Sequence, residues 1–290
     1  MNTIWSTYVQ GADLLYQTRS LRFSDLFREK YVSAFDIGER KDILEIGCGP
    51  GALSQALYRW YPDCRITGID RDTNFIEFAK KRAPYVSFLE GDATALAFLD
   101  ESFDVTVSNT VAEHIEPSKF FGEQYRVLRK DGICLVLSAR RGVNFCASCI
   151  AEQSDFENEI WSRVSKRMEE NIKDNSVCLY PMTEQEYPLC MGKYGFRNVS
   201  TEYITVNLTP DNPVYSRETA HAMINANRQS QLDGIKVLKT AASDLVSDDE
   251  IDELIRLTGL KYDKRLELYD AGIKQWDTNV SITMIMRGIK

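Results

Sequence analysis

The sequence predicts an α/β protein whose centre is a seven-stranded, mostly parallel sheet flanked by helices. Two observations carry this prediction. Short β-type runs alternate with helix-length segments from residue 41 onward, and the first run ends in a glycine-rich turn. Strands separated by helices form right-handed βαβ units, which place the strands parallel to one another. With 290 residues, 11% of them aromatic, the chain can bury the core of one large folded domain.

Five strands with intervening helices are expected in the first half of the chain. The strands fall at 43–46, 66–70, 86–90, 103–108 and 132–137. A helix carrying Leu53, Ala56 and Leu57 follows the first strand, and further helices are expected at 74–82 and 120–128. The regular alternation ends near residue 141. Two later apolar runs, at 199–206 and 280–286, complete the seven strands.

The remaining segments are predicted to be helical. Apolar residues from Trp5 to Tyr16 recur at helical spacing over residues 3–19, and Ser24 is suited to cap a second helix that runs to Phe35. A long helix is expected at 152–173 and a shorter one at 183–194.

Residues 207–277 are predicted to form a helical insertion between the last two strands. Within it, Ser247 and Glu250 have the spacing of a capping box. We therefore expect three parts: an N-terminal helical lid (1–40), a core (41–206 with 278–290) and a helical cap (207–277). Lid and cap should lie over the carboxyl edge of the sheet, as additions to one domain.

The strongest chemical signal is the segment 47–51, Gly-Cys-Gly-Pro-Gly, between the first strand and its helix. Glycines permit positive φ and let backbone N–H groups approach a ligand, and the helix N-terminus favours negative charge. This turn alone is not specific. Gly47, Gly49 and Ala52 also match the looser fingerprint of dinucleotide sites, which leaves a nicotinamide cofactor open.

Two carboxylates follow the next strands. Asp70 ends the second strand, at the place where an acid accepts hydrogen bonds from ribose hydroxyls. Asp92 follows the third strand, where a carboxylate can accept a hydrogen bond from an adenine amino group. Since the carboxyl ends of parallel strands share one edge of a sheet, both acids should face the same ligand site as the glycine turn.

With these residues in order, the sequence resembles the class I S-adenosylmethionine-dependent methyltransferases, and among them the small-molecule enzymes with a methyltransferase domain of type 11. The resemblance covers roughly residues 40–206 and 280–290 and implies a Rossmann-like fold. Residues 45–51 look like the family's first motif, and residues 109–114 like its segment after the fourth strand. Residues 125–132 are similar to its turn into the fifth strand, except that Lys130-Asp131-Gly132 replaces Pro-Gly-Gly.

The resemblance implies S-adenosylmethionine as the cofactor and a set of residues that bind it. From the core these are Glu45, Gly47, Cys48, Gly49, Gly51, Asp70, Arg71, Phe75, Asp92, Ala93, Asn109 and Thr110. From the N-terminal segment we add Tyr16 and Arg19, and we expect Arg19 or Arg22 to supply a cation for the methionine carboxylate.

The expected reaction is in-line methyl transfer to a nitrogen, oxygen, carbon or sulfur atom of a small molecule. His114 is the candidate general base or substrate contact; alternatively it packs at the start of a helix. Three other classes stay open: an NAD(P)-dependent oxidoreductase, a non-catalytic protein that binds S-adenosylmethionine, and a methyltransferase of macromolecules.

Composition limits the partners. The net charge of −8 argues against a nucleic-acid binder, and no run of about 18 apolar residues predicts a membrane-spanning helix. No signal peptide is evident and the seven cysteines are an odd number, so a cytoplasmic protein with reduced thiols is expected. The single Cys-x-x-Cys, Cys146 to Cys149, does not predict a metal site. A homodimer stays open.

Overall fold

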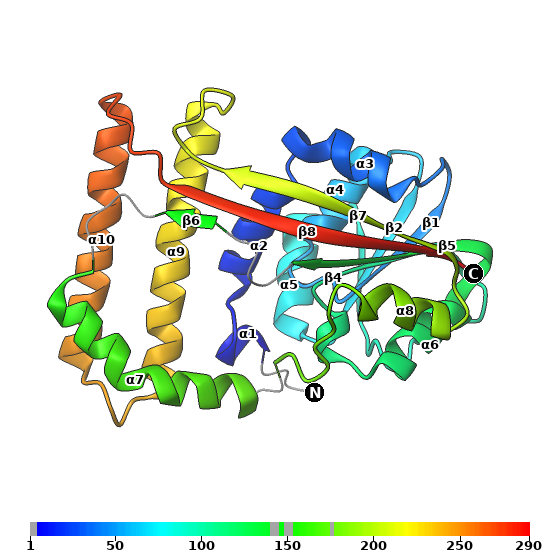
Figure 1. The fold of residues 1–290 in the computed structure, drawn as a ribbon, viewed down its shortest axis with the longest axis horizontal. Coiled ribbons are helices and arrows are strands. Elements are labelled where there is room, and N and C mark those ends of the chain that lie inside the picture. The colour runs from blue at the N-terminus through cyan, green and yellow to red at the C-terminus, as the bar shows by residue number, and fades with distance from the viewer. Residues whose placement is uncertain (1–4, 140–144, 148–152, 175–176) are drawn as a thin grey trace.

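The computed structural model describes residues 5–139, 145–147, 153–174 and 177–290 (Figure 1). Most of its sheet lies at one end of the molecule, while β8 (Thr278–Ile289) reaches toward the other end, where it pairs with β6 (Phe145–Ala147) (Figure 1). A helical layer lies beside the sheet and consists of α7 (Asp155–Asp174), α9 (Arg217–Ala241) and α10 (Asp248–Asp270) (Figure 1). Between this layer and the sheet lie α1 (Trp5–Tyr8) and α2 (Ala12–Arg22) (Figure 1). Within the described part of the chain, none of the helices combines the length and the apolar character that crossing a membrane requires.

The sheet confirms the predicted seven strands and adds one. Its strands are β1 (Asp42–Ile46), β2 (Arg65–Asp70), β3 (Ser87–Glu90), β4 (Phe103–Asn109), β5 (Leu128–Ala139), β6 (Phe145–Ala147), β7 (Arg197–Leu208) and β8 (Thr278–Ile289). The order is β3-β2-β1-β4-β5-β8, with β7 on the far side of β8. The pairs from β3 to β5 are parallel, whereas β8 runs antiparallel to both β5 and β7.

The additional strand, β6, is short and lies in the segment after β5, where the sequence pattern predicts none. It pairs antiparallel with residues 278–280 of β8, beyond the part of β8 that pairs with β5. Asn279 and Val280 also pair with β7, so β6 must lie on the opposite edge of β8 from β7, which is the edge that β5 occupies further along.

The helices occupy most of the predicted places. They are α1 (Trp5–Tyr8), α2 (Ala12–Arg22), α3 (Arg28–Phe35), α4 (Ala52–Trp60), α5 (Thr73–Arg82), α6 (Pro117–Val127), α7 (Asp155–Asp174), α8 (Glu186–Lys193), α9 (Arg217–Ala241) and α10 (Asp248–Asp270), with 3-10 turns η1 (Asp25–Phe27) and η2 (Ala112–His114). The capping box of Ser247 and Glu250 is confirmed at the start of α10.

The expectation of one continuous helix over residues 3–19 is wrong. The segment forms α1 and α2, separated at Gly11, whose backbone is extended at ψ 152°. A tertiary contact explains the break: Ser6 donates hydrogen bonds from its backbone N–H and its hydroxyl to Asp72, at 2.8 and 3.1 Å. These bonds fix α1 at the start of α5. In a continuous helix over residues 3–19, Ser6 would lie too far from Asp72 to form them.

Two apolar layers sandwich the sheet. Helices α3, α4 and α5 cover one face, around Tyr31, Leu57 and Ile76, and helices α6 and α8 cover the other, around Phe120 and Met191. The helical layer has an apolar cluster of its own, which joins α7, α9 and α10 through Ile160, Val164, Ile235, Leu238, Ile251 and Leu254. Burial of such side chains is the main stabilising contribution in both parts.

Candidate active site

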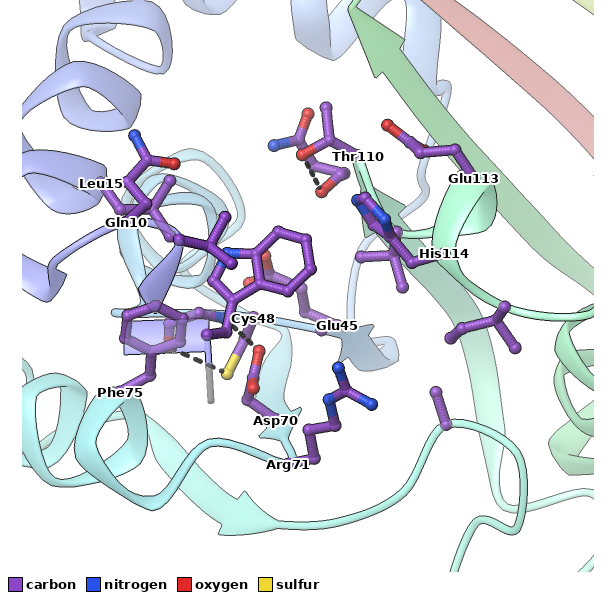
Figure 2. A pocket seen from close by; sticks show the side chains of 18 of the residues that line it. Gln10, Leu15, Glu45, Cys48, Asp70, Arg71, Phe75, Thr110, Glu113 and His114 are labelled. Carbon is purple, nitrogen blue, oxygen red and sulfur yellow. Dashed lines mark hydrogen bonds between the residues drawn. The ribbon is translucent and has the colours of Figure 1, made fainter. Parts of the chain in front are cut away.

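A cavity of about 600 Å³ opens at the carboxyl ends of β1, β2 and β4. This is the edge where open α/β sheets bind ligands, and the volume lies in the range of small-molecule sites. Its wall combines the glycine-rich turn, the loops after β2, β3 and β4, and residues of α1 and α2. Figure 2 shows side chains from these separate segments converging on one space.

The glycine-rich turn takes a backbone course that other residues adopt with strain. Gly47 has φ +66°, and a Cβ built there would lie 2.5 Å from Cγ2 of Val111. Gly51 caps α4 at φ +86°, and its Cβ would meet Phe88 at 2.8 Å. Both positions require glycine for conformation and for space. The turn therefore brings its backbone directly against the cavity and presents the N-terminus of α4 to it.

Asp70 is held rigidly at the end of β2. One carboxylate oxygen accepts the backbone N–H of Gly49 at 2.8 Å, and the other accepts that of Asp72 at 2.9 Å. A carboxylate has about four lone-pair sites, so each oxygen can still accept a further hydrogen bond. Burial raises the pKa of Asp70, opposed by these two hydrogen bonds. The carboxylate is thus fixed in orientation and retains capacity for a ligand.

Glu45 is a buried acid at the floor of the cavity. It lies on β1 with 2% of its surface exposed and accepts a hydrogen bond from the hydroxyl of Ser54. Burial raises its pKa to about 8, with a further contribution from the charge of Asp70. Glu45 is therefore mostly protonated at neutral pH. The neighbouring thiol of Cys48 is buried as well, and burial raises its pKa.

Arg19 brings a cation from α2 to the cavity wall. Its Nη2 donates to the hydroxyl of Thr110 at 3.2 Å, and Thr110 itself has the unusual φ of +54°. Burial lowers the pKa of Arg19 to about 10, helped by the charge of Arg22 and opposed by that of Glu113. The guanidinium stays charged at neutral pH. It is available to an anionic group in the cavity.

His114 lies on η2, across the cavity from the glycine turn. Its ring packs edge-on against Trp5 of α1, with the centroids 4.7 Å apart. Its Nδ1 accepts the backbone N–H of Cys178 at 2.9 Å, and the neighbouring Glu113 carbonyl accepts the backbone N–H of Tyr180 at 2.9 Å. Residues 177–180, far away in the sequence, thereby become part of the wall.

All but two of the predicted site residues lie on this cavity: Arg19, Glu45, Gly47, Cys48, Gly49, Asp70, Arg71, Phe75, Asp92, Ala93, Asn109, Thr110 and His114. Tyr16 does not line it, because its hydroxyl donates to Gln55 at 2.9 Å and Arg82 covers its ring at 4.5 Å. Gly51 stands behind the turn, where it shapes the backbone.

The predicted set of site residues leaves out several residues of the wall, namely Trp5, Gln10, Leu15, Glu113, Lys119, Leu179 and Tyr180. The sequence does point toward three of them. Trp5 and Tyr180 are aromatic residues of segments expected near the carboxyl edge of the sheet, and Glu113 belongs to the segment 109–114. Leu15 shares the helical spacing of residues 3–19, whereas Gln10, Lys119 and Leu179 belong to no motif.

Of the single Cys-x-x-Cys, Cys149 lies outside the described residues. In the described part of the chain, no group of three or more histidine, cysteine or acidic side chains is arranged to hold a metal ion.

Comparison with known proteins points to methyltransferases. A family model described as a methyltransferase domain matches residues 44–136. The fatty-acid O-methyltransferase of Mycolicibacterium smegmatis is 37% identical over 106 residues, which are 35% of this chain and 38% of that protein. The demethylmenaquinone methyltransferase of Thermotoga maritima is 30% identical over 126 residues, 43% of this chain and 55% of that protein. The matches thus span between about a third and about half of the relatives' length.

A solved structure supports the fold. The phosphoethanolamine N-methyltransferase 2 of Haemonchus contortus, crystallised with S-adenosyl-L-methionine, superposes with a TM-score of 0.53 at 18% identity. The superposition covers 99% of this chain and 59% of that one. The matched family model includes the glycine turn, Asp70, Asp92 and His114, and it favours the methyltransferase interpretation over the nicotinamide alternative. Residues 44–136 therefore carry a segment similar to methyltransferase domains, within a chain that has the fold of that solved structure.

Proposed function

We propose that this chain transfers the methyl group of S-adenosylmethionine to a small-molecule nucleophile. The observation that carries the proposal is the convergence of the glycine turn, Asp70, Asp92 and Arg19 on one cavity. These groups come from four different segments of the chain. Together they match the separate chemical parts of that cofactor.

Each part of the cofactor has a complementary group on the wall. The free lone pairs of Asp70 suit the ribose hydroxyls. Phe75 and Ala93 offer apolar surface to the adenine, and Asp92 an acceptor for its amino group. Arg19 and the N-terminus of α4 suit the methionine carboxylate.

The charge of the cavity wall also suits a cofactor with a positive sulfonium centre. Besides Glu45, which is mostly protonated at neutral pH, its wall carries the acids Asp70, Asp92, Glu113 and Glu116 against the cations Arg19, Arg71 and Lys119. An excess of acids attracts a ligand with a positive centre. When bound, S-adenosylmethionine supplies an electrophilic methyl group on its sulfonium. The residues of this chain would hold the nucleophile in line with that methyl group and exclude water.

We propose lid and cap roles for the two additions to the core. The bonds from Ser6 to Asp72 hold α1 at the mouth of the cavity, and α2 contacts both α4 of the core and α9 of the helical layer. We assign residues 1–40 as the lid and 207–277 as the cap. We also expect a cytoplasmic location and no nucleic-acid partner, on the sequence grounds of charge and composition.

The substrate is proposed to have an apolar part. Leu179 and Tyr180 line the cavity, yet they are 55% and 38% exposed, so they form an apolar rim. Two relatives are named for acting on a fatty acid and on demethylmenaquinone, and both molecules are largely apolar. A small molecule with an apolar tail would fit the rim and keep its reacting atom inside.

Calorimetric binding tests the cofactor assignment. S-adenosylmethionine and S-adenosylhomocysteine should bind with micromolar dissociation constants. Asp70→Asn should weaken both, and adenosine as well, by about 10- to 100-fold, because a hydrogen bond to a charged acceptor contributes about 1.5–3 kcal/mol. Asp63→Asn, at an exposed position before β2 at the opposite edge of the sheet, is the matched control.

A second variant separates the two ends of the cofactor. Arg19→Met should weaken S-adenosylmethionine and S-adenosylhomocysteine by a similar factor and leave adenosine, which has no carboxylate, unchanged. If none of the three ligands binds the wild-type chain, or if Asp70→Asn binds them as tightly as the control, the proposed function is wrong.

A further inference from the structure

The outer edge of β7 is open in the part of the chain that the structure describes. There β7 lies at the end of the sheet and pairs with β8 alone. Its residues 200–208 follow a regular antiparallel register with β8, so the backbone on the other side of the strand is aligned for a further strand. Four consecutive residues, 200–203, are exposed, which leaves this stretch open on both faces as well as at its edge.

The composition of this stretch favours pairing with another strand. Residues 199–206 are Val-Ser-Thr-Glu-Tyr-Ile-Thr-Val, of which six are β-branched or aromatic and only Glu202 is charged. Proteins commonly protect a sheet edge with lysines, prolines or bulges. β7 has a bulge only at its start, between Arg197 and Ser200, and it contains no proline, glycine or lysine. Its sequence therefore lacks the features that discourage a partner strand.

A second copy of the same strand complements this edge. When two β7 strands pair antiparallel about a two-fold axis at Tyr203, each Tyr203 lies opposite its own copy and Thr201 lies opposite the partner's Thr205. Aromatic pairs and threonine pairs are among the cross-strand pairs that stabilise sheets. Glu202 then lies opposite the partner's Ile204. An axis at Glu202 would instead place two carboxylates opposite each other, which is destabilising.

We propose that this chain forms a two-fold symmetric homodimer in which the β7 strands of both copies pair antiparallel about Tyr203. The sheet then continues from one subunit into the other. Pairing over residues 200–206 forms about seven backbone hydrogen bonds, within the range of about 5–15 hydrogen bonds that typical protein interfaces contain. Because both copies use the same edge, the assembly closes at two chains. The dimer is independent of the proposed function, since no residue of β7 lines the cavity.

Sedimentation velocity of the full chain, from about 1 to 100 μM, tests the association. The wild-type chain should form a dimer. Tyr203→Lys places two ammonium groups opposite each other and should raise the dissociation constant about tenfold or more. The matched control is Tyr85→Lys, because Tyr85 is 51% exposed, close to the 47% of Tyr203, and precedes β3 at the other end of the sheet.

Two results of this measurement would overturn the proposal. One is a wild-type chain that stays monomeric over the whole range, which would leave the edge to a strand of another protein. The other is a dimer that Tyr203→Lys leaves as tight as the control does. Circular dichroism of both variants shows whether they keep the native secondary structure, so that a folding defect is not mistaken for a weakened interface.

Cysteine cross-linking tests the register. In directly opposite pairs the Cα atoms are about 4.5–5.5 Å apart, which a disulfide can bridge, so oxidation should link Tyr203→Cys into a covalent dimer. Glu202→Cys is the control, because its own copy lies diagonally at about 7–8 Å, beyond easy reach of a disulfide. The wild-type chain gives the background, since Cys178 and Cys190 are partly exposed. A dimer that Tyr203→Cys does not link above this background would contradict the proposed pairing.

Discussion

Replacing Glu45 by glutamine should remove a large pH dependence of stability. Burial raises the pKa of this acid from 4.5 to about 8 in the folded chain. The folded state therefore keeps a proton that the unfolded state releases above pH 4.5. The resulting stabilisation is fully present below that pH and is lost as the pH rises toward 8.

The size of the effect follows from the shift. One pKa unit corresponds to about 1.4 kcal/mol, so the free energy of unfolding should fall by about 3 kcal/mol between pH 5.5 and pH 8 from this group alone. Glutamine imitates the protonated acid. Its amide oxygen can accept the hydroxyl of Ser54 as Glu45 does, and it has no charge to bury. The variant should therefore be the more stable chain at pH 8.

Urea unfolding at pH 5.5, 6.5 and 8, followed by the fluorescence of the four tryptophans, measures this difference. Glu77→Gln, on the exposed side of α5, controls for the loss of one negative charge. The gap between Glu45→Gln and the wild type should widen by about 3 kcal/mol over this pH range, while the control stays parallel to the wild type. Parallel curves for Glu45→Gln would show that Glu45 is ionised in the folded chain and that the reasoning is wrong.

Two further substitutions test the turn and the helical layer. Gly47→Ala should lower the free energy of unfolding by roughly 2–4 kcal/mol in urea, because the new Cβ would combine a positive φ with a clash against Val111. Adding Val111→Ala should recover only the part of this loss that comes from the clash. Full recovery would contradict the argument from backbone conformation. Lys261→Met should cost roughly 3–5 kcal/mol, because it leaves Glu157 buried without the amine now 2.5 Å from it. The double variant with Glu157→Leu should recover most of that loss, and a double variant as unstable as the single one would show that the charge is not the cause.

Much of the core could be predicted because its signals are local. Alternating strands and helices identify the sheet. Asp70 stands out because it ends a strand and Asp92 because it comes just after one, and parallel topology gathers ligand groups at this edge of the sheet. The break at Gly11 could not be predicted, since it depends on the contact between Ser6 and Asp72 across the fold. The spacing of apolar residues within one segment carries no information about a contact with a distant segment.

The contacts that hold residues 177–180 against η2 could not be predicted from the sequence, for a different reason. They use the backbone amides of Cys178 and Tyr180, and every residue except proline has such an amide, so no residue type marks them. The prediction that Tyr16 lies at the cofactor differs from the structure for a related reason. The helical pattern predicts the face of the helix on which Tyr16 lies, but it does not predict a hydrogen-bond partner. In the structure the Tyr16 hydroxyl donates to Gln55, and Tyr16 does not line the cavity.

The position of β8 has a consequence for how the chain folds. This strand follows all its partners in the sequence and lies between β5 and β7, with Ile133 pairing Ile289 across more than half of the chain. Until β8 inserts, β5 and β7 each have an open edge, and such edges are templates for pairing with other chains. Contacts of such long sequence separation also slow folding. Folding intermediates that lack β8 should therefore be the species most prone to aggregate, and refolding yield should fall as protein concentration rises.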